Sequence, residues 1–267
     1  MEAKQTVKAR PVAINDFANS PIHIIIPFKE NYFDVGRLLD EIYLIRNVTY
    51  SISLIDDNSS NPSFLKQYQA VPFINCHRFD ENKGFGYCVN HAVKNNKADI
   101  NFVLHSDVYN LPRNIFRDMA YALHYGREEK LACVSAMIDK PVPKSCSYLQ
   151  IDPDADTENY YKLLPEDGFL PFICVAFSKN AYGIAGGLAT YPYCWFEDKL
   201  LAEKFRAFGY TMGISTRVQI RHHGSKTVNL LLSQNPEIAE TLKENKKKYE
   251  AESELIKLAV QNKKKNA

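Results

Sequence analysis

The feature that most constrains the fold is a short, almost uninterrupted run of β-branched residues near the start of the chain. Residues 22–26 read IHIII, the pattern of a strand buried on both faces, and Pro27 is expected to end it. A helical spacing of apolar residues begins at Asp34, and residues 50–55 (YSISLI) form a second strand-like run. Strand, helix and strand in this order predict a βαβ unit.

The same alternation continues to about residue 220. Further helices are expected at residues 62–69, 85–93, 112–125, 179–185 and 195–208, and further strands at 73–76, 101–104, 131–138, 169–177 and 216–220. The last of these helices would bury Leu200, Leu201, Phe205 and Phe208. The predicted fold is therefore α/β, with a mixed, mainly parallel central sheet flanked by helices and a C-terminal helical extension.

Three segments are expected along the 267 residues: a lead-in at 1–20, one α/β domain at 21–228 and a helical extension at 229–267. Within the domain, residues 139–168 are rich in Pro, Asp and Ser and lack a clear period, so a functional lid or a disordered loop is expected there. The extension is rich in Glu and Lys and is expected to be a solvated helix. Its two Lys triplets, 246–248 and 263–265, leave open a peripheral association with an anionic membrane.

Composition limits the possible partners and compartments. The formal net charge of +2 gives no global field that would attract nucleic acid, so no nucleic-acid partner is expected. Residues 1–19 contain no apolar segment typical of a secretory signal, and the apolar run at 22–28 is too short to span a bilayer. The six cysteines include no Cys-x-x-Cys pair, which argues against a zinc ribbon. A cytoplasmic protein with reduced thiols is the expectation.

Acidic residues follow three of the predicted strands. They are Glu30 after the first strand, Asp56 and Asp57 after the second, and Asp107 after the strand at 101–104. Since ligands bind beyond the carboxyl ends of strands in open α/β sheets, these carboxylates would line one crevice, where a divalent cation with a phosphate ligand would relieve their repulsion. Two alternatives remain: Asp56 and Asp57 as turn residues, and Asp107 as a helix cap.

Three other groups of residues could take part in the same chemistry. Lys83 and Gly84 open a helix, whose N-terminus favours anions. Glu197 and Asp198 lie in the first turn of the helix after Trp195, where they could stabilise the helix or act as a general base. His222 and His223 end the last strand and could be metal ligands or ordinary surface residues.

The order of these motifs resembles the family 2 glycosyltransferases of the GT-A fold, over about residues 22–227. The resemblance includes the turn after the first strand (Pro27-Phe28-Lys29-Glu30), the Asp-Asp-x-Ser turn (Asp56-Asp57-Asn58-Ser59), and Asn82-Lys83-Gly84 followed by Asn90. It also includes the Gly-Gly loop (Gly186-Gly187) and the Glu-Asp pair (Glu197-Asp198). The family's metal-binding Asp-x-Asp is represented by His105-Ser106-Asp107, a departure at its first residue.

The resemblance implies a role for each matched residue. Metal ligands would be Asp107 and, chosen between the two late histidines, His223, with Mn²⁺ or Mg²⁺ as the ion. Asp198, beside Glu197, would be the catalytic base, and Gly186, Gly187 and Trp195 would form the acceptor and donor loop. The nucleotide would be bound by residues of the first three motifs, with Asp57 against the base: Pro27, Phe28, Glu30, Asp56, Asp57, Lys83, His105 and Ser106.

The function implied is an inverting transfer of a sugar from a UDP- or dTDP-type donor to a hydroxyl on a glycan, a lipid-linked molecule or a protein. Two alternatives stay open. A nucleotidyltransferase that makes nucleotide-sugars normally has a Gly-rich loop after its first strand, and residues 27–30 contain no Gly. A non-catalytic nucleotide-sugar binding module is conceivable because His105 alters the metal motif, although the Glu197-Asp198 pair is intact.

Overall fold

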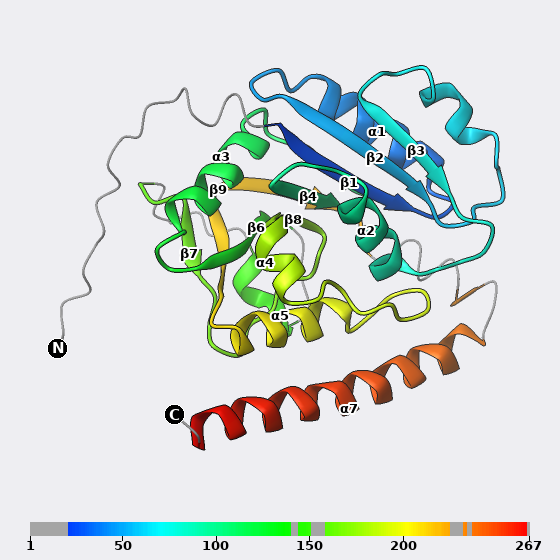
Figure 1. Ribbon diagram of the computed structural model, residues 1–267. Coiled ribbons are helices and arrows are strands. Elements are labelled where there is room, and N and C mark those ends of the chain that lie inside the picture. The colour runs from blue at the N-terminus through cyan, green and yellow to red at the C-terminus, as the bar shows by residue number, and fades with distance from the viewer. Residues whose placement is uncertain (1–20, 140–143, 151–157, 225–231, 234–236, 266–267) are drawn as a thin grey trace.

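Alternating strands and helices build one nine-stranded sheet with helices packed against it (Figure 1). The computed structural model describes residues 21–139, 144–150, 158–224, 232–233 and 237–265. Its strands are β1 (Ile22–Phe28), β2 (Tyr50–Asp56), β3 (Ile74–Arg78), β4 (Ile100–Leu104), β5 (Val108–Tyr109), β6 (Leu131–Ile138), β7 (Tyr161–Leu163), β8 (Cys174–Ser178) and β9 (Thr211–His222). The expected lead-in, 1–20, lies outside the described residues.

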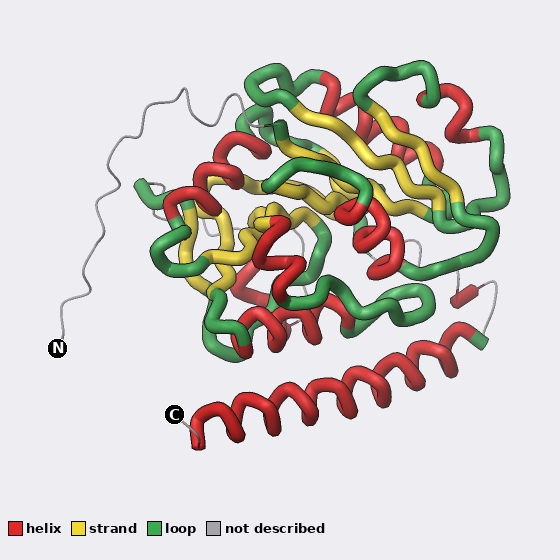
Figure 2. Tube along the Cα trace, viewed as in Figure 1, coloured by secondary structure: helices red, strands yellow, loops and turns green. Residues whose placement is uncertain are grey.

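The helices fall close to the predicted ranges (Figure 2). They are α1 (Tyr32–Tyr43), α2 (Phe85–Lys94), α3 (Ile115–Tyr125), α4 (Lys179–Ile184), α5 (Glu197–Ala207) and α7 (Ile238–Lys265), with 3₁₀ turns η1 (Phe64–Tyr68) and η2 (Lys144–Leu149). Ser178 caps α4 through a hydrogen bond from the Ala181 amide. No helix in the described ranges is long and apolar enough to cross a membrane.

The sheet order is β3-β2-β1-β4-β8-β6-β9-β5, and β7 pairs with β9. The neighbours β3, β2, β1 and β4 are parallel to one another. Strand β8 is antiparallel to both of its neighbours, β4 and β6, and β6 is parallel to β9. The expected mixed α/β sheet is confirmed, although parallel pairing is less dominant than predicted. The chain passes from β1 through α1 to β2 in one direction across the sheet, and from β3 through α2 to β4 in the opposite direction. Since such connections are right-handed, α1 and α2 lie on opposite faces of the sheet.

Four local expectations were wrong. Pro27 does not end β1, which continues to pair with β2 up to Phe28. Pairing of β1 with β4 stops at Ile25, so the N–H that Pro27 lacks lies beyond the last β1–β4 pair. β8 starts at Cys174, after Pro171 has interrupted the expected strand, and β9 begins at Thr211 because it pairs with the whole of β6. Phe208 follows α5 and is 49% exposed.

Two segments expected to be irregular or solvated are more ordered than predicted. Between 139 and 168 the chain forms η2, which is kinked at Cys146, and β7, which pairs with β9. Residues 140–143 and 151–157 of the expected lid lie outside the description. Helix α7 is confirmed, but it is not solvated all round. It packs alongside α5, with Leu242, Asn245, Tyr249 and Ser253 buried on one face (Figure 1).

Candidate functional site

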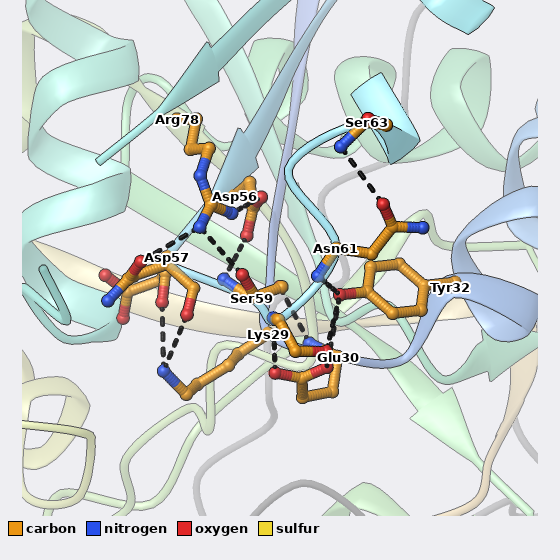
Figure 3. Close-up of polar contacts among 11 residues, drawn as sticks. Lys29, Glu30, Tyr32, Asp56, Asp57, Ser59, Asn61, Ser63 and Arg78 are labelled. Carbon is orange, nitrogen blue, oxygen red and sulfur yellow. Dashed lines mark hydrogen bonds and ion pairs between the residues drawn. The ribbon is translucent and has the colours of Figure 1, made fainter. Parts of the chain in front are cut away.

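The turn after β2 is held from within by Asp56. This carboxylate is fully buried, forms an ion pair with Arg78 and accepts a hydrogen bond from the Ser59 amide at 2.8 Å (Figure 3). Arg78 also donates to the Ser59 carbonyl and the Asn58 side chain. In-register pairing of Asp56 with Arg78 at the ends of β2 and β3 brings these groups together. Asp56 therefore shapes the turn, which agrees with the alternative interpretation of this residue.

The turn after β1 is tied to the same segment. Glu30 accepts hydrogen bonds from the Ser60 amide (2.7 Å), the Ser60 hydroxyl (2.8 Å) and the Tyr32 hydroxyl (3.1 Å), while Lys29 donates to two carbonyls of the β2 turn (Figure 3). Phe28 is 3% exposed and packs edge-on against Phe64. Pro27 and Phe28 thus lead into a turn whose Lys29 and Glu30 side chains are already bonded to the segment after β2.

Asp57 connects the turn after β2 to the start of α2. Its carboxylate accepts hydrogen bonds from the amides of Lys83 (2.7 Å) and Gly84 (3.0 Å) and from the Asn82 side chain (2.8 Å). Burial nevertheless raises the pKa of Asp57, since these bonds offset only part of the lost hydration. The Lys83 side chain extends into solvent and pairs with Glu81. Gly84 has φ +85°, and a Cβ there would lie 2.4 Å from the Tyr191 carbonyl.

Beyond β4, His105, Asp107 and His222 form a compact group of potential metal ligands. One ligand atom from each lies within 4.8 Å of the others, and His222 Nε2 is 3.0 Å from Asp107 Oδ1. The strand β5, which starts at Val108, pairs with the end of β9 and so brings His222 to Asp107. Ser106, between His105 and Asp107, is buried, and its hydroxyl accepts a hydrogen bond from the side-chain amide of Asn31 at 3.4 Å.

The charges in this group suit a cation. Burial, with the nearby His222, lowers the pKa of His105 to about 4, so the imidazole is neutral and free to coordinate at neutral pH. Burial opposes ionisation of Asp107, but the His222 hydrogen bond and both imidazoles outweigh it and lower the pKa to about 2. A carboxylate and two imidazoles, with two donor atoms about 3 Å apart, fit ion–ligand bonds of roughly 2.1 Å.

His223, the histidine preferred from the sequence, lies elsewhere. Neighbouring residues at a strand end point to opposite sides, so His222 faces Asp107 while His223 stacks on Tyr109 at 4.4 Å and contacts Arg37 at 3.1 Å. The structure therefore corrects the choice within the pair: His222 is the potential ligand.

The N-terminus of α2 joins the metal group to the segment before α5. The Phe85 ring packs edge-on against His105, with centroids 5.2 Å apart, and the Phe85 amide donates to the Tyr193 carbonyl at 2.8 Å. Further along α2, Asn90 donates to the Leu188 carbonyl and accepts from the Tyr182 hydroxyl at 2.6 Å. One helix start thus contacts the Asp57 turn, the metal group and the segment 188–193.

The Gly186-Gly187 loop precedes this segment. Both glycines have positive φ, +78° and +70°, and a Cβ on Gly187 would lie 2.6 Å from Asn90 Oδ1. The space beside Gly186 is open. The loop can therefore approach a ligand at Gly186 while Gly187 is fixed against α2.

Glu197 and Asp198 begin α5 after an unusual turn. Three residues before them that are not glycine have left-handed backbones: Tyr193 (φ +64°), Trp195 (φ +87°) and Phe196 (φ +73°). Glu197 is 4% exposed, and its Oε2 has no hydrogen-bond partner among the described residues. Burial and the adjacent Asp198 hold the pKa of Glu197 well above its usual range. Burial raises the pKa of Asp198 to about 6.

Sequence reasoning missed Arg78, and Asn90 was noted only as part of a motif. Arg78 carried a detectable signal, a cation at the end of the strand next to Asp56. Trp195 is 47% exposed and precedes the carboxylate pair by two residues. The contacts above connect the Asp57 turn, the His105–Asp107–His222 group and the segment before α5 through helix α2.

Comparisons with known proteins bear on the fold. No protein-family model and no curated protein matches the chain. Among solved structures, it is similar to a mannosyltransferase from Pyrobaculum calidifontis in complex with GDP-Man and Mn²⁺, with a TM-score of 0.58, 16% identity and coverage of 77% of this chain and 57% of that one.

Two other matches have the same character. GalNAc-T7 with UDP, GalNAc and Mn²⁺ gives a TM-score of 0.55 at 12% identity, over 76% of this chain and 43% of that one. TarS of S. aureus, residues 1–349, gives 0.57 at 13% identity, over 77% and 61%. The chain thus spans about half the length of the proteins it matches. Its fold is that of these glycosyltransferases, and the predicted GT-A fold is confirmed.

Proposed function

We propose that this protein is an inverting glycosyltransferase that moves a sugar from a nucleoside-diphosphate sugar of the UDP or dTDP type to a hydroxyl acceptor. One observation carries the proposal. The start of α2 contacts Asp57, the His105–Asp107–His222 group and the turn that leads to Asp198, so a base-binding surface, a cation site and a general base adjoin one another. The matched mannosyltransferase holding GDP-Man and Mn²⁺ supports it.

The donor would bind along the carboxyl ends of β1, β2 and β4. Asp57 keeps acceptor capacity on Oδ1 for an N–H of the nucleotide base, because the Lys83 amide takes one lone pair of this carboxylate oxygen. Lys83 adds a positive charge near that point. Asp56, Glu30 and Phe28 would hold this surface in shape from behind, because their own groups are already paired or buried.

His105, Asp107 and His222 would hold the divalent cation. When bound, it would supply a Lewis acid for the negative charge of the diphosphate leaving group. Two imidazoles and one carboxylate are a better donor set for Mn²⁺ than for Mg²⁺, which prefers oxygen ligands and its own waters.

Asp198 would take the proton from the acceptor hydroxyl as that oxygen attacks the anomeric carbon. A pKa of about 6 leaves this carboxylate ionised at neutral pH yet basic enough to accept a proton. Since the base works only when ionised, kcat should fall about tenfold per pH unit below pH 6 and level off above it.

The test is a donor screen followed by product analysis. Thermal shift with UDP-, dTDP- and GDP-sugars, with and without Mn²⁺, identifies a donor because a ligand of the folded state raises Tm. Incubation with that donor and an acceptor panel, read by NMR, gives the product and its anomeric configuration. Transfer with inversion supports the proposal. Donor binding with no transfer would favour a binding module, and synthesis of the nucleotide-sugar from a sugar phosphate would favour a nucleotidyltransferase.

A further inference from the structure

One face of helix α7 is buried although the helix is rich in Lys and Glu. Leu242, Asn245, Tyr249 and Ser253 are each at most 8% exposed and recur at helical spacing. They face α5 and the segment that precedes it, and α7 runs alongside α5 in Figure 1. The middle of this buried face is polar, because Asn245 has no exposed surface at all.

Asn245 bonds the backbone of the turn before α5. Its Nδ2 donates to the Pro192 carbonyl at 2.8 Å and to the Cys194 carbonyl at 3.1 Å, so both donors of one amide hold two carbonyls of the same turn. Its Oδ1 is buried and has no partner within the described ranges. Leaving a buried acceptor unpaired costs free energy, so a residue chosen only for packing would be apolar.

Two further contacts from α7 lie beside this turn. Tyr249 stacks on Phe196, with ring centroids 5.3 Å apart and planes 14° apart, and Tyr191 donates to Glu252 at 3.0 Å. Helix α7 therefore contacts Tyr191 just before the turn, the Pro192 and Cys194 carbonyls within it, and Phe196 at its last residue. On the opposite side the turn is held by the Phe85 amide, which bonds Tyr193.

The turn needs such support because its backbone is strained. A left-handed conformation at a residue other than glycine costs on the order of 1 kcal/mol, and Tyr193, Trp195 and Phe196 all adopt it. Strain of this kind persists only where the surroundings impose it. Released from α7, the turn would relax and move the first residues of α5, where Glu197 and Asp198 lie.

We propose that α7 is a positioning element of the acceptor side of the site, and that Asn245 is its principal positioning residue. Asn245 fixes the carbonyls of Pro192 and Cys194, which holds Trp195 outward and sets the direction of Asp198. The inference rests on the proposed function for its catalytic consequence, while the conformational consequence stands on the contacts alone.

The test uses the full chain and three variants. Asn245→Asp is nearly isosteric but places a carboxylate against two carbonyls, and Asn245→Ala removes the donors without adding charge. Asn262→Asp makes the same change on an exposed position of the same helix and is the matched control.

Trp195 is the only tryptophan in the sequence, so intrinsic fluorescence reports on this turn alone. Far-UV circular dichroism checks folding, and Asn245→Ala replaces Asn245→Asp if the latter unfolds.

We expect acrylamide to quench Trp195 less strongly in both Asn245 variants than in the wild type or in Asn262→Asp, because the released turn no longer holds the indole outward. We expect kcat to fall about 10- to 100-fold, the order of loss that a misplacement of about 1 Å produces, while the Kd for UDP with Mn²⁺ stays unchanged. Quenching equal to that of the control would overturn the proposal, and so would parallel losses of kcat and UDP affinity. If the wild type transfers no sugar, the proposed function fails, and Trp195 quenching still decides the role of Asn245.

Discussion

The carboxylates of the proposed donor side (Glu30, Asp56 and Asp57) and those of the proposed acceptor side (Glu197 and Asp198) differ in how they are hydrogen-bonded. On the donor side, Asp56 is paired with Arg78, and Asp57 and Glu30 each accept three hydrogen bonds from well-placed groups. On the acceptor side, Glu197 has an oxygen without a partner in the described chain, and Asp198 has only the adjacent Lys199 amide at 2.7 Å.

The difference separates acids that build structure from acids that remain reactive. A carboxylate whose lone pairs are taken by backbone amides is fixed in place and contributes to folding, whereas a buried, poorly bonded one has a raised pKa and can exchange a proton. Backbone strain does not follow this division, because left-handed residues that are not glycine occur at Glu30 and Asn58 as well as at three positions just before Glu197. Because of the difference in hydrogen bonding, substitutions on the two sides should differ in what they damage.

The largest effect is expected at Asp198. Asp198→Asn keeps the shape of the side chain and removes its basicity, so kcat should fall about 10²- to 10⁴-fold, the contribution of a positioned general base. The Kd for UDP with Mn²⁺, measured by calorimetry, should not change, because Asp57 and the metal group lie on the donor side. Glu254→Gln, an exposed carboxylate on α7, is the control. Unchanged turnover in Asp198→Asn would remove this residue from the mechanism.

A smaller effect is expected at the metal group, where two adjacent histidines form a matched pair. His222→Ala should weaken Mn²⁺ binding at least about 10- to 100-fold, since even residues that only support a metal ligand have effects of that order. His223→Ala should leave Mn²⁺ affinity unchanged, because that ring stacks on Tyr109. Calorimetric titration of Mn²⁺ into each variant measures both. Equal losses at the two positions would contradict the assignment of His222.

On the donor side, Asp56→Asn should reduce stability more than any acceptor-side change. The substitution leaves the half-buried guanidinium of Arg78 without its counter-ion, at a cost of about 1–3 kcal/mol in the free energy of unfolding. Asp139→Asn is the matched control, since Asp139 pairs with Arg221, which is largely exposed, and should lose less than about 1 kcal/mol. Urea denaturation compares the two. Equal losses would mean that the Asp56 pair is not structural.

The same division explains what could be predicted from the sequence. Periodicity located β1, β2, α2 and α5 because their patterns are local, and acidic residues after strands marked the site because parallel strands align their ends. Which neighbour takes up each carboxylate depends on register: Arg78 meets Asp56 only because β3 pairs with β2 in one alignment. The choice between His222 and His223 likewise depends on which of two adjacent strand residues points toward Asp107.

The docking of α7 was beyond sequence reasoning for a different reason. Its buried face contains Asn245 and Ser253, so apolar spacing gives a weak signal in a helix dominated by Lys and Glu. A polar residue in a helix normally indicates exposure. Here the buried amide matches carbonyls of a turn about fifty residues earlier, which no local pattern reveals.

The smallest expected effect is a gain at Glu197. Because burial and Asp198 raise the pKa of Glu197 in the folded protein, the native state binds a proton that the unfolded chain has released, and stability declines as pH rises from the ordinary carboxyl range toward the raised pKa. Glu197→Gln cannot lose a proton. It should therefore be more stable than the wild type at pH 7, by an amount within about 1 kcal/mol, and equally stable below pH 4. Thermal melts across this pH range, with Glu254→Gln as the exposed control, measure the difference. A Glu197→Gln variant that is no more stable than the wild type at pH 7 would show that Glu197 is ionised in the fold, and the contrast between the two sides would then rest on Asp198 alone.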